Sequence, residues 1–126
     1  MAGFSKQTAP RDESAGPVQN RSGDVDGYTI DFITAVAPVD GAPLLKGLPD
    51  DRCQCPHWGY VLKGRITYVY ADREESFGPG DAFYAPPGHS PLWEAGSEFV
   101  HFSPTEEVRV VGEHMRNAMK EMASHG

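Results

Sequence analysis

The sequence predicts an all-β domain that ends in one helix. Three features support this prediction: short runs rich in β-branched and aromatic residues, glycine and proline between these runs, and a helical spacing of apolar residues near the C-terminus. The chain has 126 residues, of which 14 are glycine and 11 are proline. Because domains commonly span ~100–150 residues, we expect one domain with one core.

The first 16 residues contain little that a core could bury. Phe4 is their only large apolar side chain beyond Met1, and Ser, Gln, Pro and charged residues make up most of the rest. We therefore expect residues 1–16 to form a mobile tail and residues 17–126 to form the single domain.

The central part of the chain is expected to form a series of short strands. Alternating residues predict a first strand over residues 28–36, and the prolines and glycines of residues 37–52 predict a long loop. Residues 57–71 read as two strands joined by a bend at Lys63-Gly64. Further strands are expected at residues 74–77, 82–85, 92–94 and 98–102. This close spacing of strands and turns is typical of a sandwich or barrel.

The C-terminal segment has the features of a helix. Ser103 can cap the first turn, Pro104 suits the first helical position, and Glu106 stands three residues after the cap. We expect a helix over about residues 104–123 that packs on the barrel, with its methionines in the core or in a dimer contact. Its apolar residues recur at spacings of three and four: Val108, Val111, Met115, Met119 and Met122.

Charge and composition argue against several classes of partner. The chain has 18 acidic and 11 basic residues, a net charge of −7, and this surface repels phosphate backbones and anionic lipids. We therefore expect no nucleic-acid or membrane partner, and no apolar run predicts a transmembrane helix or signal peptide. Two cysteines so close together cannot form a disulfide framework, so we expect a cytoplasmic protein.

Two cysteines and a histidine form a candidate metal site. Cys53, Cys55 and His57 stand at i, i+2 and i+4, so in a strand all three side chains leave the same face. They would supply three of the four ligands that zinc prefers. His89 follows the stiff segment Pro86-Pro87-Gly88 and is the leading candidate for the fourth ligand.

Other interpretations of these residues stay open. A disulfide between Cys53 and Cys55 would strain the geometry of the bridge, and both cysteines could instead be inert core residues. His89 could be a turn histidine that bonds to the backbone. His101 shares strand parity with Phe99 and could also face inward as a ligand.

Two segments resemble the signature motifs of the cupins, small β-barrels that typically hold one metal ion. The first cupin motif is H-x-H-x3or4-E-x6-G, and His57 with Gly64 reproduces its E-x6-G half, with His57 at the glutamate position. The second motif, G-x5-P-x-G-x2-H-x3-N, is matched in register by Gly80, Pro86 and Gly88. The resemblance covers about residues 28–102.

The sequence departs from the cupin pattern at the metal ligands. The two histidines of the first motif fall on Asp51 and Cys53, which makes Cys55 an additional thiol. The second-motif histidine falls on Pro91, and His89 lies two residues earlier with the same strand parity. Thiolate ligands favour zinc or copper over the harder metals.

The resemblance implies a cupin-type double-stranded β-helix, also called a jelly-roll barrel, with the barrel at about 28–102 and the C-terminal helix after it. It also implies one divalent metal ion, for which we predict the ligands Cys53, Cys55, His57 and His89. Zinc is favoured, with iron, copper or manganese as alternatives. Strand parity from His57 places Gly59, Val61 and Lys63 inside the barrel and Trp58, Tyr60 and Leu62 outside.

Three functions are compatible with this sequence. The first is a small metalloenzyme that acts on a small organic molecule in the barrel. The second is a non-enzymatic cupin with a structural or ligand-sensing metal site, and the third is a metal-free dimeric scaffold. The number of protein ligands separates the first two, because a reactive site keeps one position open. We also expect a homodimer, since exposed strand edges tend to be covered by pairing.

Overall fold

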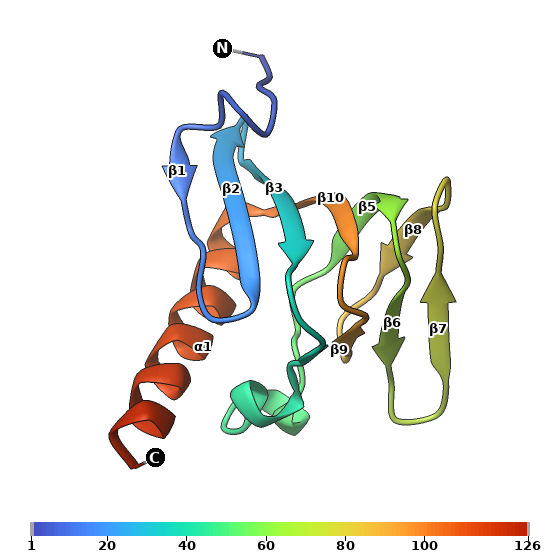
Figure 1. The fold of residues 1–126 in the computed structure, drawn as a ribbon. Coiled ribbons are helices and arrows are strands. Elements are labelled where there is room, and N and C mark those ends of the chain that lie inside the picture. Colours follow the sequence, from blue (N-terminus) through green and yellow to red (C-terminus); the bar gives the residue numbers. More distant parts are fainter. Residues whose placement is uncertain (1, 126) are drawn as a thin grey trace.

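The protein folds as two antiparallel sheets that face each other, followed by one helix (Figure 1). The structure is a computed structural model and describes residues 2–125. The six-stranded sheet has the order β1 (Arg11–Asp12), β2 (Val18–Val25), β3 (Tyr28–Ala35), β10 (Glu98–Pro104), β5 (His57–Lys63), β8 (Ala82–Ala85). The four-stranded sheet has the order β4 (Val39–Asp40), β9 (Ser90–Trp93), β6 (Ile66–Val69), β7 (Glu74–Phe77). The predicted all-β class with a C-terminal helix is confirmed.

The main core lies between the two sheets. Because alternate residues of a strand point to opposite faces, one set of alternate residues on the central strands reaches this core. Phe99 of β10 and Tyr68 of β6 are among its largest fully buried side chains. The whole buried cluster consists of Ile33, Val61, Ile66, Tyr68, Tyr70, Phe83, Ala85 and Phe99.

The helix α1 (Thr105–His125) packs on a loop that contains two short 3-10 segments, η1 (Ala42–Leu45) and η2 (Pro49–Asp51). Val111 of α1 forms a second buried cluster with Leu45, Cys53 and Cys55. Figure 1 shows α1 along one side of the molecule, beside the N-terminal strands. The helix therefore covers the segment that carries both cysteines.

The helix begins later than the sequence predicts. Pro104 ends β10, where it pairs with Tyr28 of β3, and α1 starts at Thr105. The side chain of Ser103 is fully buried and bonds to a histidine instead of capping the helix. The prediction of a cap at Ser103 is wrong because the ladder between β3 and β10 continues past this residue.

The first 16 residues also differ from expectation. Phe4 packs edge-on against Phe32, with 6.1 Å between the ring centroids, and Ala9 is buried. The short strand β1 pairs with β2. The sequence predicts neither of these two strands. The polar sequence of β2, VQNRSGDV, hides a strand because backbone pairing, not apolar alternation, holds it in the sheet.

The two faces of β3 have an unexpected polarity. Thr29, Asp31 and Ile33 are buried inside the barrel, whereas Tyr28 is exposed and the other residues of its parity are partly exposed. The more apolar set of alternating residues therefore faces outward. Polar groups on the inside of a barrel indicate a site rather than a plain core.

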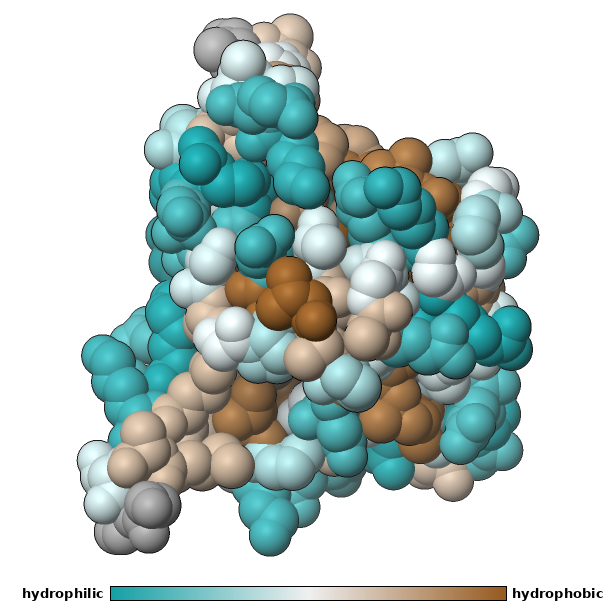
Figure 2. Space-filling view, viewed as in Figure 1, coloured by the Kyte–Doolittle hydropathy of each residue, from teal (hydrophilic) through white to brown (hydrophobic). Residues whose placement is uncertain are grey.

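The face in Figure 2 is mostly hydrophilic, with separate hydrophobic patches. Within residues 2–125, no helix combines the length and the apolar character needed to cross a bilayer.

Candidate metal centre

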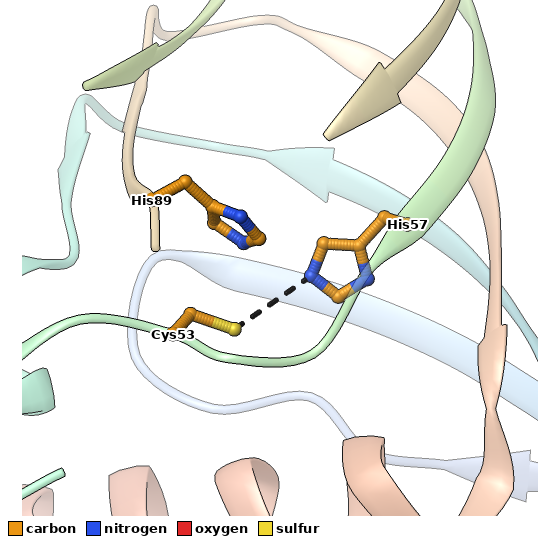
Figure 3. Close-up of side chains that lie close together, drawn as sticks. All are labelled: Cys53, His57 and His89. Atoms are coloured by element: carbon orange, nitrogen blue, oxygen red, sulfur yellow. Dashed lines mark hydrogen bonds between the residues drawn. The ribbon is translucent and has the colours of Figure 1, made fainter. Parts of the chain in front are cut away.

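Three of the four predicted ligands converge inside the barrel. The donor atoms of Cys53, His57 and His89 lie within 4.8 Å of one another, and all three side chains are buried (Figure 3). His57 begins β5, so its place is set by the sheet. Cys53 and His89 form an isolated bridge in which the amide of Cys53 donates to the carbonyl of His89 over 2.8 Å. Backbone pairing therefore places residues that are distant in sequence side by side.

Hydrogen bonds orient both imidazole rings. Nδ1 of His89 lies 2.8 Å from the carbonyl oxygen of Pro86. A carbonyl only accepts, so Nδ1 carries the proton and Nε2 keeps a free lone pair. Nδ1 of His57 lies 2.6 Å from Oγ of Ser103, and its Nε2 lies 3.9 Å from Sγ of Cys53. Both rings can therefore bind a metal ion through Nε2, with their second nitrogen held by the protein.

The donor set fits zinc. Bonds of ~2.0–2.3 Å in a tetrahedron separate neighbouring ligand atoms by roughly 3.5 Å. The donor atoms of Cys53, His57 and His89 lie within 4.8 Å of one another, and Sγ of Cys53 and Nε2 of His57 are 3.9 Å apart, which is close to this spacing. One thiolate and two imidazoles also match the ligand types that zinc and copper prefer.

Burial sets the protonation of these groups. Desolvation lowers the pKa of His57 well below its usual value and lowers the pKa of His89 to about 4. The same effect raises the pKa of Cys53 to about 11. The imidazoles are therefore neutral and able to bind metal, whereas the thiol must release its proton when a metal ion binds.

Cys55 does not join this cluster. Its Sγ lies 3.5 Å from the carbonyl oxygen of Pro56, and the side chain packs with Leu45 and Val111 below α1. The expectation of one strand through Cys53, Cys55 and His57 is wrong, because β5 begins only at His57. Pro56 has no N–H to donate to a ladder, so the strand pairing of β5 begins only after it, at His57.

Asp51 and His101 also lie outside the three-ligand group. The carboxylate of Asp51 is exposed and accepts a hydrogen bond from the amide of Gly47. His101 stacks on His57, with 4.3 Å between ring centroids, and its Nε2 lies 3.0 Å from Oδ2 of Asp31. The structure thus pairs His101 with a carboxylate beside the candidate site.

Sequence reasoning missed Asp31 and Ser103, which hold these histidines. Asp31 also accepts a hydrogen bond from the side chain of Asn20 over 3.0 Å. One signal could have revealed Asp31: it is a charged residue within the strand-like run of residues 28–36. Burying a carboxylate in a barrel costs free energy unless the carboxylate has hydrogen-bond or charged partners. Ser103 gave no such signal, because it also matched a helix cap.

A cavity of about 930 Å³ lies next to the cluster, between the barrel and α1. Cys53, His57 and His101 contribute to its wall, together with apolar residues of the loop and helix such as Leu45 and Met115. Ligand sites commonly measure ~300–1,000 Å³ and combine apolar walls with a few polar groups. The cavity can therefore hold a small organic molecule against Cys53 and His57.

No family model matches the sequence, and no curated protein is similar to it. Solved structures are similar in fold. An RmlC-like cupin from Shewanella frigidimarina has a TM-score of 0.56 at 15% identity, with 80% of this chain and 88% of that chain covered. The polyketide cyclase RemF from Streptomyces resistomycificus has a TM-score of 0.55 at 19% identity, with coverage of 82% and 79%.

A protein of unknown function from Rhizobium leguminosarum is also similar, with a TM-score of 0.57 at 18% identity over 82% of this chain and 94% of that chain. At such identities the likeness concerns the fold alone. The protein has the cupin fold, as the motifs around His57 and Gly80 imply. Its buried Cys/His/His cluster is a candidate metal site in that fold.

Proposed function

We propose that this protein is a metal-binding cupin that uses one divalent metal ion to act on a small organic molecule inside its barrel. The observation that supports this proposal most is the convergence of three protein ligands, not four, next to a cavity whose wall includes two of them, Cys53 and His57. Zinc sites that only stabilise a fold are closed by four protein ligands, whereas catalytic sites keep one position for water or substrate. The enzyme RemF, which has the same fold, gives further support.

The residues divide into those that hold the metal and those that orient them. Cys53, His57 and His89 would bind the ion, and Ser103 would fix the ring of His57. Zinc is the metal we favour, because one thiolate and two imidazoles suit it better than iron or manganese. A bound zinc ion supplies Lewis acidity to an oxygen of the organic ligand.

A non-enzymatic cupin is the second candidate, and one observation favours it. Cys55 is a buried free thiol in the same short segment as Cys53. If its side chain turned toward the ion, the site would be closed by four protein ligands and could be structural or ligand-sensing. Buried free thiols also fit the reducing compartment that we propose for this protein.

Elemental analysis of the purified protein tests the metal site. We expect close to one zinc ion per chain in the wild type and loss of this metal in the Cys53→Ser, His57→Ala double variant. Cys55→Ser is the matched control, since it removes a buried thiol that lies outside the cluster, and it should keep the metal. Unchanged stoichiometry in the double variant would contradict the proposed site.

Cobalt substitution separates the two candidate functions. Co²⁺ in an open site should change its visible absorption spectrum when azide is added, because azide occupies the free position. A site closed by Cys55 should give the same spectrum with and without azide in the wild type, and should respond to azide in Cys55→Ser. That second result would favour the non-enzymatic cupin.

A further inference from the structure

The outer face of the six-stranded sheet is unusually apolar. Six large side chains from β3, β5, β8 and β10 lie on it with between 42% and 47% of their surface exposed. Isolated apolar residues on a surface need no explanation, but a contiguous group of this kind marks an interaction site. The six residues are Tyr28, Trp58, Tyr60, Leu62, Tyr84 and Phe102, and we call them the aromatic face.

Strand register makes the aromatic face contiguous. Trp58 of β5 pairs with Phe102 on one side and with Tyr84 on the other, and Phe102 pairs in turn with Ile30 of β3. Side chains at directly paired positions lie ~4.5–5.5 Å apart. The rings of Trp58 and Tyr84 are already stacked, with 5.0 Å between their centroids. The row therefore crosses four strands without a gap.

The aromatic face carries almost no charge, unlike the rest of this acidic chain. Among the residues that face outward on these four strands, all of which the structure describes, the only charged ones are Lys63, where the ladder shifts register at the end of β5, and Glu98 at the end of β10. Its carboxylate lies 3.8 Å from the ammonium groups of both Lys6 and Lys63. Two copies of a chain with a net charge of −7 repel each other least across such a face.

The chain itself covers a neighbouring part of the same face. Phe4 packs on Phe32, and an added Cβ at Gly23 would lie 2.6 Å from the ring of Phe4. The N-terminal segment thus shields the outer side of β2 and of part of β3, whereas the aromatic face remains exposed.

We propose that the aromatic face is the interface with a second copy of this chain. Five of the six side chains are aromatic, and an aromatic side chain offers ~150–250 Å², so at 42–47% exposure the six residues together expose on the order of 500 Å². This is near the upper range for the largest apolar patch of a monomer, and more than half of the ~800 Å² that one partner contributes to a standard interface. The proposal does not depend on the metal site.

Sedimentation velocity at micromolar concentration tests the dimer. We expect a mass about twice the 13.7 kDa of one chain. Trp58→Arg places a charge at the centre of the aromatic face and should raise the dissociation constant of the dimer at least about 10-fold. Tyr84→Arg is a second variant nearer the sheet edge, which keeps the test valid if the first fails to fold. A wild-type protein that stays monomeric would overturn the proposal.

The control variant changes an exposed apolar residue elsewhere. Val110 on α1 is 63% exposed and lies outside the aromatic face, so Val110→Arg should leave the dimer intact. An equal loss of the dimer in Val110→Arg, or a dimer that persists in a folded Trp58→Arg protein, would place the interface elsewhere and overturn the proposal.

Fluorescence gives a readout local to the aromatic face. The chain has two tryptophans, so in a Trp93→Phe protein only Trp58 emits. Its emission should shift to longer wavelength as dilution separates the dimer and exposes the indole to water. Emission that stays constant while the sedimenting mass falls would show that Trp58 is not in the interface.

Discussion

Ser103 shows how one buried hydroxyl can prepare a metal ligand. It is fully buried on β10, and its Oγ lies 2.6 Å from Nδ1 of His57. This contact holds the ring so that Nε2 faces Cys53 and His89. Outer partners of this kind orient the ligand and reduce the motion that it must lose when a metal ion binds.

We predict that Ser103→Ala weakens zinc binding by about 10- to 100-fold without removing the site, because the three ligands stay but His57 loses its anchor. Competition titration with a chromophoric chelator measures this affinity. Ser97→Ala is the matched control, since Ser97 is equally buried but bonds to the backbone of Arg65 away from the cluster. Equal losses of affinity in both variants would indicate a general effect on packing.

The buried histidines also predict how the stability of the metal-free protein depends on pH. Unfolded histidine has a pKa of about 6.5, whereas burial lowers the pKa of His57 and brings that of His89 to about 4. Between these values the unfolded state binds more protons than the folded state, so stability falls as the pH falls. His89 alone should account for about 3 kcal/mol over this range.

Urea unfolding of chelator-treated protein between neutral pH and pH 4 measures this effect. The free energy of unfolding should decrease steadily below about pH 6.5. In His89→Gln the decrease should be smaller, because one buried titrating group is gone. A free energy of unfolding that does not change over this range would contradict the assignment of neutral, buried imidazoles.

How far the sequence predicts the site depends on what holds each residue. His57 could be placed because the glycine spacing of the first cupin motif fixes its strand, and His89 because it follows a stiff turn. The direction of the Cys55 side chain could not be predicted, because Pro56 ends the strand pairing and the alternation of β5 does not extend back to Cys55. Asp31 depends on which face of β3 turns inward, which is a tertiary choice that local periodicity does not reveal.

At the scale of elements, α1 is held by few buried contacts for its length. Val111 is its one core residue among those the structure describes, where it packs with Leu45, Cys53 and Cys55, and Val108 and Met115 are partly buried beside it. Docking of α1 therefore depends on the same loop that carries the cysteines. The helix and the candidate metal site are physically coupled through this cluster.

We predict that Val111→Ala lowers the free energy of unfolding by about 2 kcal/mol, because it removes two buried methyl groups and leaves a small cavity. Its neighbour provides the control: Val110 is 63% exposed, and Val110→Ala should change stability by no more than about 0.5 kcal/mol. Chemical denaturation measures both. Equal effects of the two substitutions would show that α1 does not dock through Val111.

The strands were predictable where turns delimit them, and not elsewhere. The bend at Lys63-Gly64 separates β5 from β6, and the turn at Gly78 to Asp81 separates β7 from β8. The bounds of these four strands agree closely with those expected. The strand β2 was missed because the residues that it turns toward the barrel are polar: Ser22 is buried, and Asn20 bonds to Asp31. Lys63 was expected inside but is exposed and pairs with Glu98, since the ladder between β5 and β10 shifts register there.

At the scale of the whole molecule, the six-stranded sheet separates two tasks by its faces. Its inner face supplies His57 and His101 to the cavity, and its outer face presents the aromatic residues. A sheet with a polar interior loses part of the apolar burial that stabilises a small domain. We therefore expect binding of a metal ion, and pairing of the outer face, to add substantially to the stability of this chain.

This expectation gives the last prediction. A ligand that binds only the folded state stabilises it by about 2.7 kcal/mol at a concentration one hundred times its dissociation constant. For a chain of 126 residues this corresponds to a rise in Tm of about 10 °C on addition of zinc to chelator-treated protein. Calorimetry measures the shift, with protein concentration fixed so that any dimer contributes equally. The Cys53→Ser, His57→Ala double variant lacks two of the three ligands and should show no rise. An equal rise in both proteins would mean that zinc stabilises the fold from another site.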